Sequence, residues 1–481
     1  MLPLKWMDMQ NWRRFLLKKE VLVFLAAFGV RLLAFLFLLW WFRISGQMQD
    51  PTAIFPYPVL GGDSTDYAVL TQNLWQHGTF SSSLSMPLIP ESFRLPGYPF
   101  FLYLFQFLPF PFIVATIVQM IMGAATATLV YLLGKKFLSE KAGLIGALLF
   151  AIEPTSILFS TTIMSDTIFV FALLLGIYLL FHKTKTLWGA IAVGFFAGVL
   201  FGYSVLVRVI AQYLAVFLIA VYLLINRKSL RPWHHTFLKL AVFAFAMILV
   251  MLPWALRNER VFDTYTLSST PYINFTQYNL VYFYAYKNNV SKEEAKHVYA
   301  DRIPYREDSF WFRSLINEEI FKQEMKEGLE GNVVPYAMFH LVKTLPFFLN
   351  DSLRDINRMI GFFPPPASVV NFTDLLLQKD VRGVIAYLKT PQPDLWMLLV
   401  GSAVWVLISL LSIGYALYAV ITRQKNVWFV LFALGVIFYF GVLSSPVIQP
   451  RYRMPAAPFM LLLAAEAGIL LYSLTKKRAR R

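Results

Sequence analysis

Long apolar runs that carry almost no charge recur along the chain. Most have about 20 residues, which is the length at which a helix crosses a hydrocarbon core about 30 Å thick. Because a chain in lipid must satisfy its own backbone polar groups, each run is predicted to be a transmembrane α-helix. The predicted spans are 21–42, 112–133, 142–162, 166–182, 187–207, 209–225, 237–256, 394–421, 427–446 and 455–474. The chain is therefore predicted to be an all-α polytopic membrane protein.

Two segments between these runs are too long to be simple connections. One is the first outer loop, about 43–111, inside an N-terminal membrane part that we assign to 1–256. The other is an outer segment, 257–393, which precedes a C-terminal membrane part, 394–481. Both long segments are predicted to lie on the same side of the membrane.

The outer segment has mixed charge and many aromatic residues, and its charged stretches 291–300 and 314–330 have a helical pattern. Residues 333–349 are apolar but are interrupted by Pro335 and Pro346. We interpret 333–349 as a helix at the membrane interface or a partial span rather than a full crossing.

Charge and composition fix the orientation. Hydrophobic residues make up 58% of the 481-residue chain and charged residues 15%, and the formal net charge is +16. The Lys and Arg residues gather at alternate ends of the apolar runs, as cytoplasmic loops require, so the charge indicates topology rather than nucleic-acid binding. We expect a multi-pass plasma-membrane protein with both termini in the cytoplasm. The first run is too long for a signal-peptide core and is expected to be retained.

Acids and arginines collect on the predicted outer side, although charge at a membrane is costly and marks function or a buried pair. Asp63 and Asp66 follow the first span, Asp166 lies in a short outer turn, and the arginines lie near outer span ends. The arginines are Arg94, Arg208, Arg257, Arg451 and Arg453. A carboxylate can take a proton from an attacking hydroxyl, and arginine forks can hold a phosphate as charge builds on it. One carboxylate suffices for an inverting displacement, whereas a retaining one requires a nucleophile as well.

Each of these residues also has a structural interpretation. Asp63 is compatible with a turn, Asp166 with a helix N-cap, and each arginine with an interfacial anchor. Arg31 and Glu466 lie deep in the first and last spans and are predicted to form a buried pair. The chain has no cysteine, which excludes disulfides and thiolate catalysis, and its histidines show no ligand spacing, so neither a metal site nor a cofactor is predicted.

Six short motifs occur in an order that resembles GT-C fold glycosyltransferases that use polyprenyl-phosphate sugars. They are Asp63 with Tyr67, Arg94-Leu95-Pro96-Gly97-Tyr98-Pro99, Pro154 with Ser165-Asp166, Leu206-Val207-Arg208, Pro253-Trp254 with Arg257-Asn258, and Arg451-Tyr452-Arg453-Met454-Pro455. The chain looks most like glycosyltransferase family 39, which includes relatives of protein O-mannosyltransferases and of the lipid A aminoarabinose transferase. This resemblance implies a bundle of about 10 to 13 transmembrane helices with interfacial helices in the outer loops.

The resemblance also implies roles for particular residues. Asp63 would be the catalytic carboxylate and Asp166 a second acid that orients donor or acceptor. The family often has Glu where this chain has Ser64, so Asp66 is a candidate to replace that acid. The five arginines would bind the donor phosphate, and the substrate would be positioned by Tyr67, Tyr98, Asn258 and Tyr452. Transfer would be inverting and metal-independent, from a lipid-linked sugar to a glycan, lipid or protein acceptor.

Three other functions remain open from the sequence. A transporter or flippase of an amphipathic substrate would be expected to show repeated halves and charge near the bilayer midplane, whereas here the charges collect at one face. A GT-C-like polymerase or ligase would share the outer site but use a diphosphate-linked donor. A non-catalytic assembly protein would give no reason for the Asp and Arg set.

Overall fold

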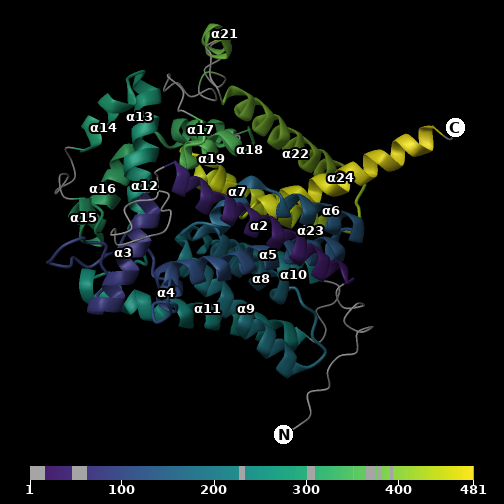
Figure 1. Ribbon diagram of the computed structural model, residues 1–481, viewed down its shortest axis with the longest axis horizontal. Coiled ribbons are helices and arrows are strands. Elements are labelled where there is room, and N and C mark those ends of the chain that lie inside the picture. The colour runs from purple at the N-terminus through teal and green to yellow at the C-terminus, as the bar shows by residue number, and fades with distance from the viewer. Residues whose placement is uncertain are drawn as a thin grey trace.

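The computed structural model describes residues 17–45, 62–226, 233–300, 309–349, 352–363, 375, 381–389 and 394–479. Throughout these residues the regular structure is helical (Figure 1). Seven helices are long and apolar enough to cross a membrane. They are α2 (Lys19–Ile44), α5 (Pro111–Phe137), α9 (Leu187–Val207), α11 (Trp233–Phe262), α22 (Leu395–Ile421), α23 (Val427–Ser444) and α24 (Ala457–Arg478). The prediction of an all-α polytopic membrane protein is confirmed.

Three of the predicted spans differ from a single long helix. The run at 142–162 forms α6 (Glu140–Ala151) and α7 (Pro154–Ser160), which meet at an angle of 57°. The run at 209–225 forms a short 3-10 turn, η1 (Val209–Ala211), and then α10 (Leu214–Asn226). Helix α8 (Asp166–Leu180) has 15 residues and is therefore only about 22 Å long, shorter than a hydrocarbon core of about 30 Å.

The bend between α6 and α7 follows from Pro154, which has no N–H to continue the helix and disfavours helical geometry in the residue before it. Glu153 then caps α7, since its Oε1 and Oε2 accept from the backbone N–H groups of Thr155 (3.1 Å) and Ser156 (2.5 Å). Each of these bonds satisfies a donor that a new helix start would leave unpaired.

Arg31 of α2 stabilises the same bend. Its guanidinium donates to the carbonyl of Ala151 at 3.3 Å and to the Ser156 hydroxyl at 3.2 Å, and it interacts electrostatically with Glu153. The predicted pair of Arg31 with Glu466 is therefore wrong: Glu466 accepts from the Ser139 hydroxyl at 2.6 Å, near the start of α6. Both residues lie in spans, but they lie at different depths of the bundle.

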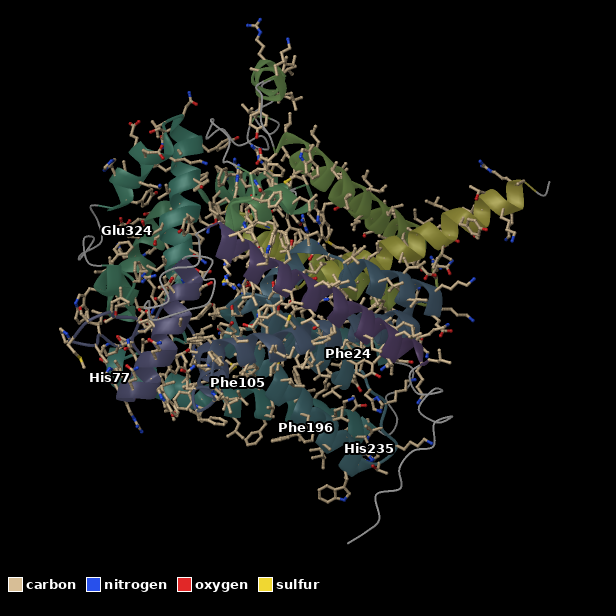
Figure 2. All side chains as sticks on the ribbon, in the orientation of Figure 1. Phe24, His77, Phe105, Phe196, His235 and Glu324 are labelled. Atoms are coloured by element: carbon tan, nitrogen blue, oxygen red, sulfur yellow. The ribbon has the colours of Figure 1, made fainter. Side chains whose placement is uncertain are left out.

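Whereas α4 (Gly97–Tyr103) lies closer to the membrane helices, the outer segment forms short helices near α3 (Gly62–His77), on the left in Figure 1. These helices are α12 (Thr270–Asn274), the π-helix η2 (Phe275–Leu280), α13 (Val281–Asn288), α14 (Lys292–Ala300), α15 (Ser309–Phe312), η3 (Leu315–Asn317) and α16 (Glu318–Leu329). Helices α14 and α16 confirm the two predicted helical stretches. Polar side chains crowd this region around Glu324, whereas Phe196, which is 59% exposed, projects from α9 (Figure 2).

Residues 333–349 form α17 (Val333–Thr344) and α18 (Pro346–Leu349), an apolar pair that is too short for a full crossing. Its position at the membrane interface stays a prediction. Two further short helices, α19 (Leu353–Ile360) and α21 (Val381–Lys389), precede α22.

Glycines at every fourth position let α9 pack directly on the backbone of α11. A Cβ atom added to Gly194, Gly198 or Gly202 would lie 2.5, 2.3 or 2.7 Å from a backbone carbonyl oxygen of α11. In lipid, where apolar surface drives helix association weakly, such close backbone contact is a main source of packing energy.

We expect Gly198→Ala to lower the free energy of unfolding by about 1–3 kcal/mol, because the added methyl group would clash with the Phe243 carbonyl. Gly414→Ala on α22 is the matched control, since a Cβ there has no atom within 4 Å. Thermal unfolding of both variants in detergent measures the difference, and equal midpoints would contradict this account of the interface.

Candidate active site

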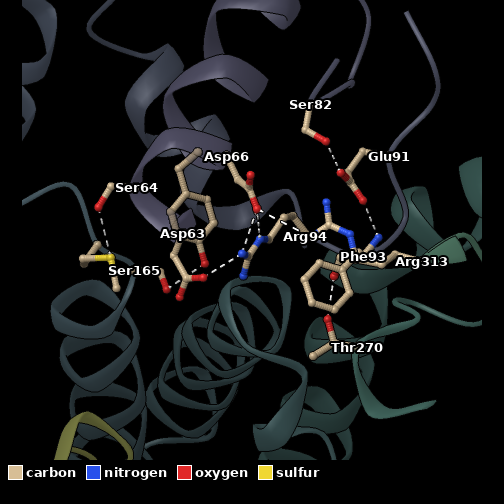
Figure 3. Close-up of polar contacts among 12 residues, drawn as sticks. Asp63, Ser64, Asp66, Ser82, Glu91, Phe93, Arg94, Ser165, Thr270 and Arg313 are labelled. Atoms are coloured by element: carbon tan, nitrogen blue, oxygen red, sulfur yellow. Dashed lines mark hydrogen bonds and ion pairs between the residues drawn. The ribbon is translucent and has the colours of Figure 1, made fainter. Parts of the chain in front are cut away.

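Two carboxylates project from the first two turns of α3. Asp63 and Asp66 are three residues apart and so lie on one face of the helix, and both contact Arg94 (Figure 3). Each side chain is only 24% exposed, so both are largely shielded from water.

Arg94 lies between these carboxylates. Its Nη2 is 2.7 Å from Asp63 Oδ1, and its Nε and Nη2 are 3.0 and 2.8 Å from Asp66 Oδ2. The guanidinium also lies over the ring of Tyr67, with its carbon 5.5 Å from the ring centroid. One arginine therefore holds both acids of α3.

Arg451 binds the other oxygen of Asp63. It comes from η4 (Pro450–Arg453), the 3-10 turn that precedes α24, and its Nη1 lies 2.5 Å from Asp63 Oδ2. Burial alone would raise the pKa of Asp63, but the charges and hydrogen bonds of Arg451 and Arg94 outweigh it and hold this pKa well below its ordinary value. Asp63 is a carboxylate with both oxygens engaged.

A second acid and arginine pair lies beside the first. Asp166 begins α8 and is 2% exposed, and its Oδ2 is 2.7 Å from Nη2 of Arg208, which ends α9. The two pairs are linked, since Tyr67 shares a hydrogen bond of 3.1 Å with the Ser165 hydroxyl. Arg451 also interacts electrostatically with Asp166 and with the adjacent Tyr452. The structure thus brings together seven sequence-predicted residues with Tyr452 at their edge: Asp63, Asp66, Asp166, Arg94, Arg208, Arg451 and Tyr67.

Two of the predicted arginines bind backbone instead of these carboxylates. Arg257 donates to the carbonyl of Glu91 at 2.8 Å and to Asn258 Oδ1 at 2.9 Å. Arg453 donates to the carbonyl of Phe347 at 2.8 Å and lies 3.7 Å from the centroid of the Trp405 ring. Both contacts fasten neighbouring elements to the bundle.

The remaining predicted residues, Asn258 and Tyr98, are also buried in internal contacts. Asn258 donates to the carbonyls of Thr266 and Leu267, and the Tyr98 hydroxyl donates to Gln119 Oε1 at 3.0 Å. Tyr98 packs edge-on against Tyr67, with ring centroids 4.8 Å apart, and so helps to hold the Tyr67 ring in place.

Arg313 reaches the site from the outer segment, and the sequence did not single it out. Its Nη1 lies 3.8 Å from Asp66 Oδ2, and its guanidinium stacks on the Phe93 ring at 4.7 Å. Arg94 lies 4.8 Å from the same ring. No motif marks Arg313, because its neighbours Trp311 and Phe312 resemble the other aromatic residues of this segment.

Comparisons with known proteins identify the fold that carries this arrangement. The dolichyl-phosphate-mannose-protein mannosyltransferase family profile matches residues 94–254, which include Arg94, Asp166 and Arg208. The archaeal oligosaccharyltransferase AglB from Archaeoglobus fulgidus, solved with an inhibitory peptide and a dolichol-phosphate, has a similar structure with a TM-score of 0.50 and 14% identity. That match covers 97% of this chain and 52% of AglB, so the chain spans about half the length of that enzyme.

The chain has a GT-C fold. A further structure, ArnT from Cupriavidus metallidurans bound to undecaprenyl phosphate, is similar with a TM-score of 0.36 and 12% identity over 96% of this chain and 78% of ArnT. A search of curated protein sequences found no match. The resemblance inferred from the six motifs is confirmed at the level of the fold.

In this GT-C bundle, Glu91 organises the loop that carries Arg94. Its buried carboxylate accepts from the backbone N–H groups of Ser92 (3.0 Å) and Phe93 (2.7 Å) and from the Ser82 hydroxyl (Figure 3). On the other side, Ser268 and Thr270 donate their hydroxyls to the Phe93 carbonyl. The loop before Arg94 is thereby fixed from both sides.

Metal independence is a separate expectation of the resemblance. Among the residues that the structure describes, no three His, Asp or Glu side chains gather into a set that could hold a metal ion. Metal independence stays a prediction.

We expect Glu91→Gln to loosen this loop, because the neutral amide oxygen makes weaker hydrogen bonds to the two backbone N–H groups and the amide NH2 replaces the oxygen that accepts from Ser82. The free energy of unfolding should fall by about 1–3 kcal/mol. Limited proteolysis between residues 79 and 96 should also become faster. Glu330→Gln, at an exposed position, is the control. Unchanged stability and cleavage in Glu91→Gln would show that this network does not hold the loop.

Proposed function

We propose that this protein is an integral membrane glycosyltransferase that moves a sugar from a polyprenyl-phosphate donor to a hydroxyl acceptor outside the cytoplasm. The observation that carries the proposal is the shielded Asp63, held between Arg94 and Arg451 and linked through Tyr67 and Ser165 to Asp166. The dolichol-phosphate in the AglB structure supports a lipid-phosphate ligand for this fold.

The reaction requires one base and a set of fixed cations. The acceptor hydroxyl oxygen attacks the anomeric carbon of the sugar while the bond from that carbon to the phosphate oxygen breaks. Asp63 takes the hydroxyl proton, and the bonding electrons leave with the phosphate, which departs as polyprenyl monophosphate. Arg94 and Arg451 stabilise the negative charge that builds on the leaving oxygen. A single displacement of this kind inverts the anomeric centre.

Asp166 and Arg208 form a second, more deeply buried pair beside this centre. We assign to Asp166 the orientation of donor or acceptor, because its position at the start of α8 is fixed by Arg208 and by the neighbouring Ser165. Asp66 keeps Arg94 in place.

The charged ends of the helices support an outward orientation of the site. The acids of the site lie at the start of α3 and α8. Lysines lie at the ends of the membrane helices that are far from the site: Lys19 at the start of α2, Lys135 in the last turn of α5 and Lys476 in the last turn of α24. Under the positive-inside rule, the lysine ends face the cytoplasm and the site faces outward.

A transporter is the alternative from another class. The bent pair α6 and α7 and the buried Arg31 are features that transporters also use. Here, however, Arg31 binds the Ala151 carbonyl and Ser156 at the bend, and Glu153 caps α7. These charged groups therefore stabilise a fixed bend. The acids of the site instead form a separate, shielded cluster with arginines at one end of the bundle.

We expect Asp63→Asn to fold and to bind donor but to lose sugar transfer, because the amide cannot accept the hydroxyl proton. Release of polyprenyl monophosphate, measured by mass spectrometry with purified protein, is the readout. Asp263→Asn is the control, because Asp263 is exposed and has a positive φ, which Asn adopts readily. Unchanged turnover in Asp63→Asn would remove Asp63 from the mechanism.

We expect Arg451→Ala to weaken donor binding by roughly 1.5–3 kcal/mol, since the phosphate loses a charged hydrogen-bond partner. This corresponds to a roughly 10- to 150-fold rise in the donor Kd. Arg451→Lys should recover only part of it, because lysine lacks the planar fork. The same loss with a phosphate-free donor analogue would refute phosphate binding by Arg451.

A further inference from the structure

In the protein without donor, the proposed base Asp63 is bound by the same two arginines that are proposed to bind the donor phosphate. Both oxygens of Asp63 are bound, Oδ1 by Arg94 and Oδ2 by Arg451, and these two guanidinium groups are also the ones that a donor phosphate requires. A carboxylate in this state is a weak base, because two cations stabilise its ionised form. Proton transfer from the acceptor would therefore be unfavourable before the donor arrives.

We propose that the donor phosphate displaces Asp63 from Arg94 and Arg451, so that donor binding itself converts Asp63 into the working base. The inference rests on the proposed function and concerns how the same site is switched on. The phosphate takes over the guanidinium donors, and the freed carboxylate faces the acceptor hydroxyl beside a new negative charge.

Arg451 has a spare donor that a new partner could use. Its Nε is buried and has no hydrogen-bond partner, while its Nη1 binds Asp63. A phosphate can accept from Nε and an Nη group together, which is the bidentate geometry that arginine favours. The exchange would satisfy a buried donor that the free state leaves unpaired, and such a donor costs about 1–3 kcal/mol.

Arg94 can release Asp63 without losing its position. It binds Asp66 through both Nε and Nη2, so Asp66 anchors the guanidinium while Asp63 is exchanged for phosphate. Phe93 and Tyr67 also flank it. This gives the two acids of α3 different tasks, with Asp66 as the permanent partner and Asp63 as the exchangeable one.

The direction in which donor binding shifts the pKa of Asp63 also depends on the other groups around Asp63 and its two arginines. Tyr278 of the outer segment interacts electrostatically with Asp63 itself. The others act on its neighbours: Arg313 contacts Asp66, the Tyr67 ring lies against Arg94, and Tyr452 and Asp166 interact with Arg451. These groups stay in place during the exchange. Loss of two cation contacts and arrival of an anion both raise the pKa of Asp63, so donor binding is coupled to proton uptake as the pH falls.

Proton uptake on binding tests this directly. The probe is a farnesyl methyl phosphodiester, which carries a single negative charge over the working pH range and so cannot take up the proton itself. Titration calorimetry of the full chain in buffers of different ionisation enthalpy gives the protons bound per probe. We expect uptake to rise towards about one proton between about pH 7 and about pH 5, to vanish in Asp63→Asn, and to persist in Asp263→Asn.

The outcomes separate the two proposals. If the phosphodiester does not bind, the phosphate site of the proposed function fails, and the inference fails with it. If it binds without proton uptake, or if the uptake survives in Asp63→Asn, the inference is overturned while the phosphate site stands.

A kinetic measurement on the unmodified protein gives an independent answer that does not require a variant to fold. With acceptor in excess, the acid limb of kcat reports the donor-bound enzyme, and the acid limb of kcat/KM for the donor reports the enzyme without donor. We expect kcat to fall on acidification through Asp63, while kcat/KM shows no limb from this group above about pH 4. Acid limbs at the same pH in both profiles would overturn the exchange.

Discussion

The pairing of Asp63 with Arg94 and Arg451 is the interaction on which the arrangement of the site depends. Arg451 is 388 residues from Asp63 along the chain, so this contact joins the start of α3 to the turn before α24. Charges shielded from water are costly unless they are paired, and removal of one partner leaves the others uncompensated. The first outer loop and the C-terminal helices must therefore meet in one geometry before any of these side chains is stable.

The irregular path from α6 to α8 sets the depth of the second acid. Pro154 and Glu153 bend the chain into α7, and Gln119 of α5 then holds the carbonyls of Phe159 and Thr162 at 2.8 and 2.7 Å. Helix α8 consequently begins late and is too short to cross a hydrocarbon core alone. Asp166, its first residue, therefore lies inside the bundle at 2% exposure rather than at the surface. The short helix is what brings this acid to Arg208.

Much of the fold was readable from hydropathy, since the predicted range 187–207 coincides with α9, but the partners of individual charges were not. Burying an arginine requires acceptors without specifying which ones, so Arg257 and Arg453 bind backbone carbonyls while Arg94 and Arg451 bind carboxylates. The same limitation explains the wrong pairing of Arg31 with Glu466. Arg313 escaped notice because its place beside Asp66 depends on how the outer segment folds back, and periodicity carries no information about that contact.

Hydrogen bonds hold the outer segment and the loop before Arg94 together. The backbone N–H of Ser269 donates to the Ser92 carbonyl at 3.0 Å, and the Ser92 hydroxyl accepts from the backbone N–H of Leu315 at 2.9 Å. Close to these bonds, Arg94 and Arg313 stack on the same Phe93 ring. A shift of the outer segment would strain these bonds and move Arg94, and with it both acids of α3. The segment can therefore vary only on surfaces that face away from this junction, because the junction itself sets the positions of Arg94 and Arg313.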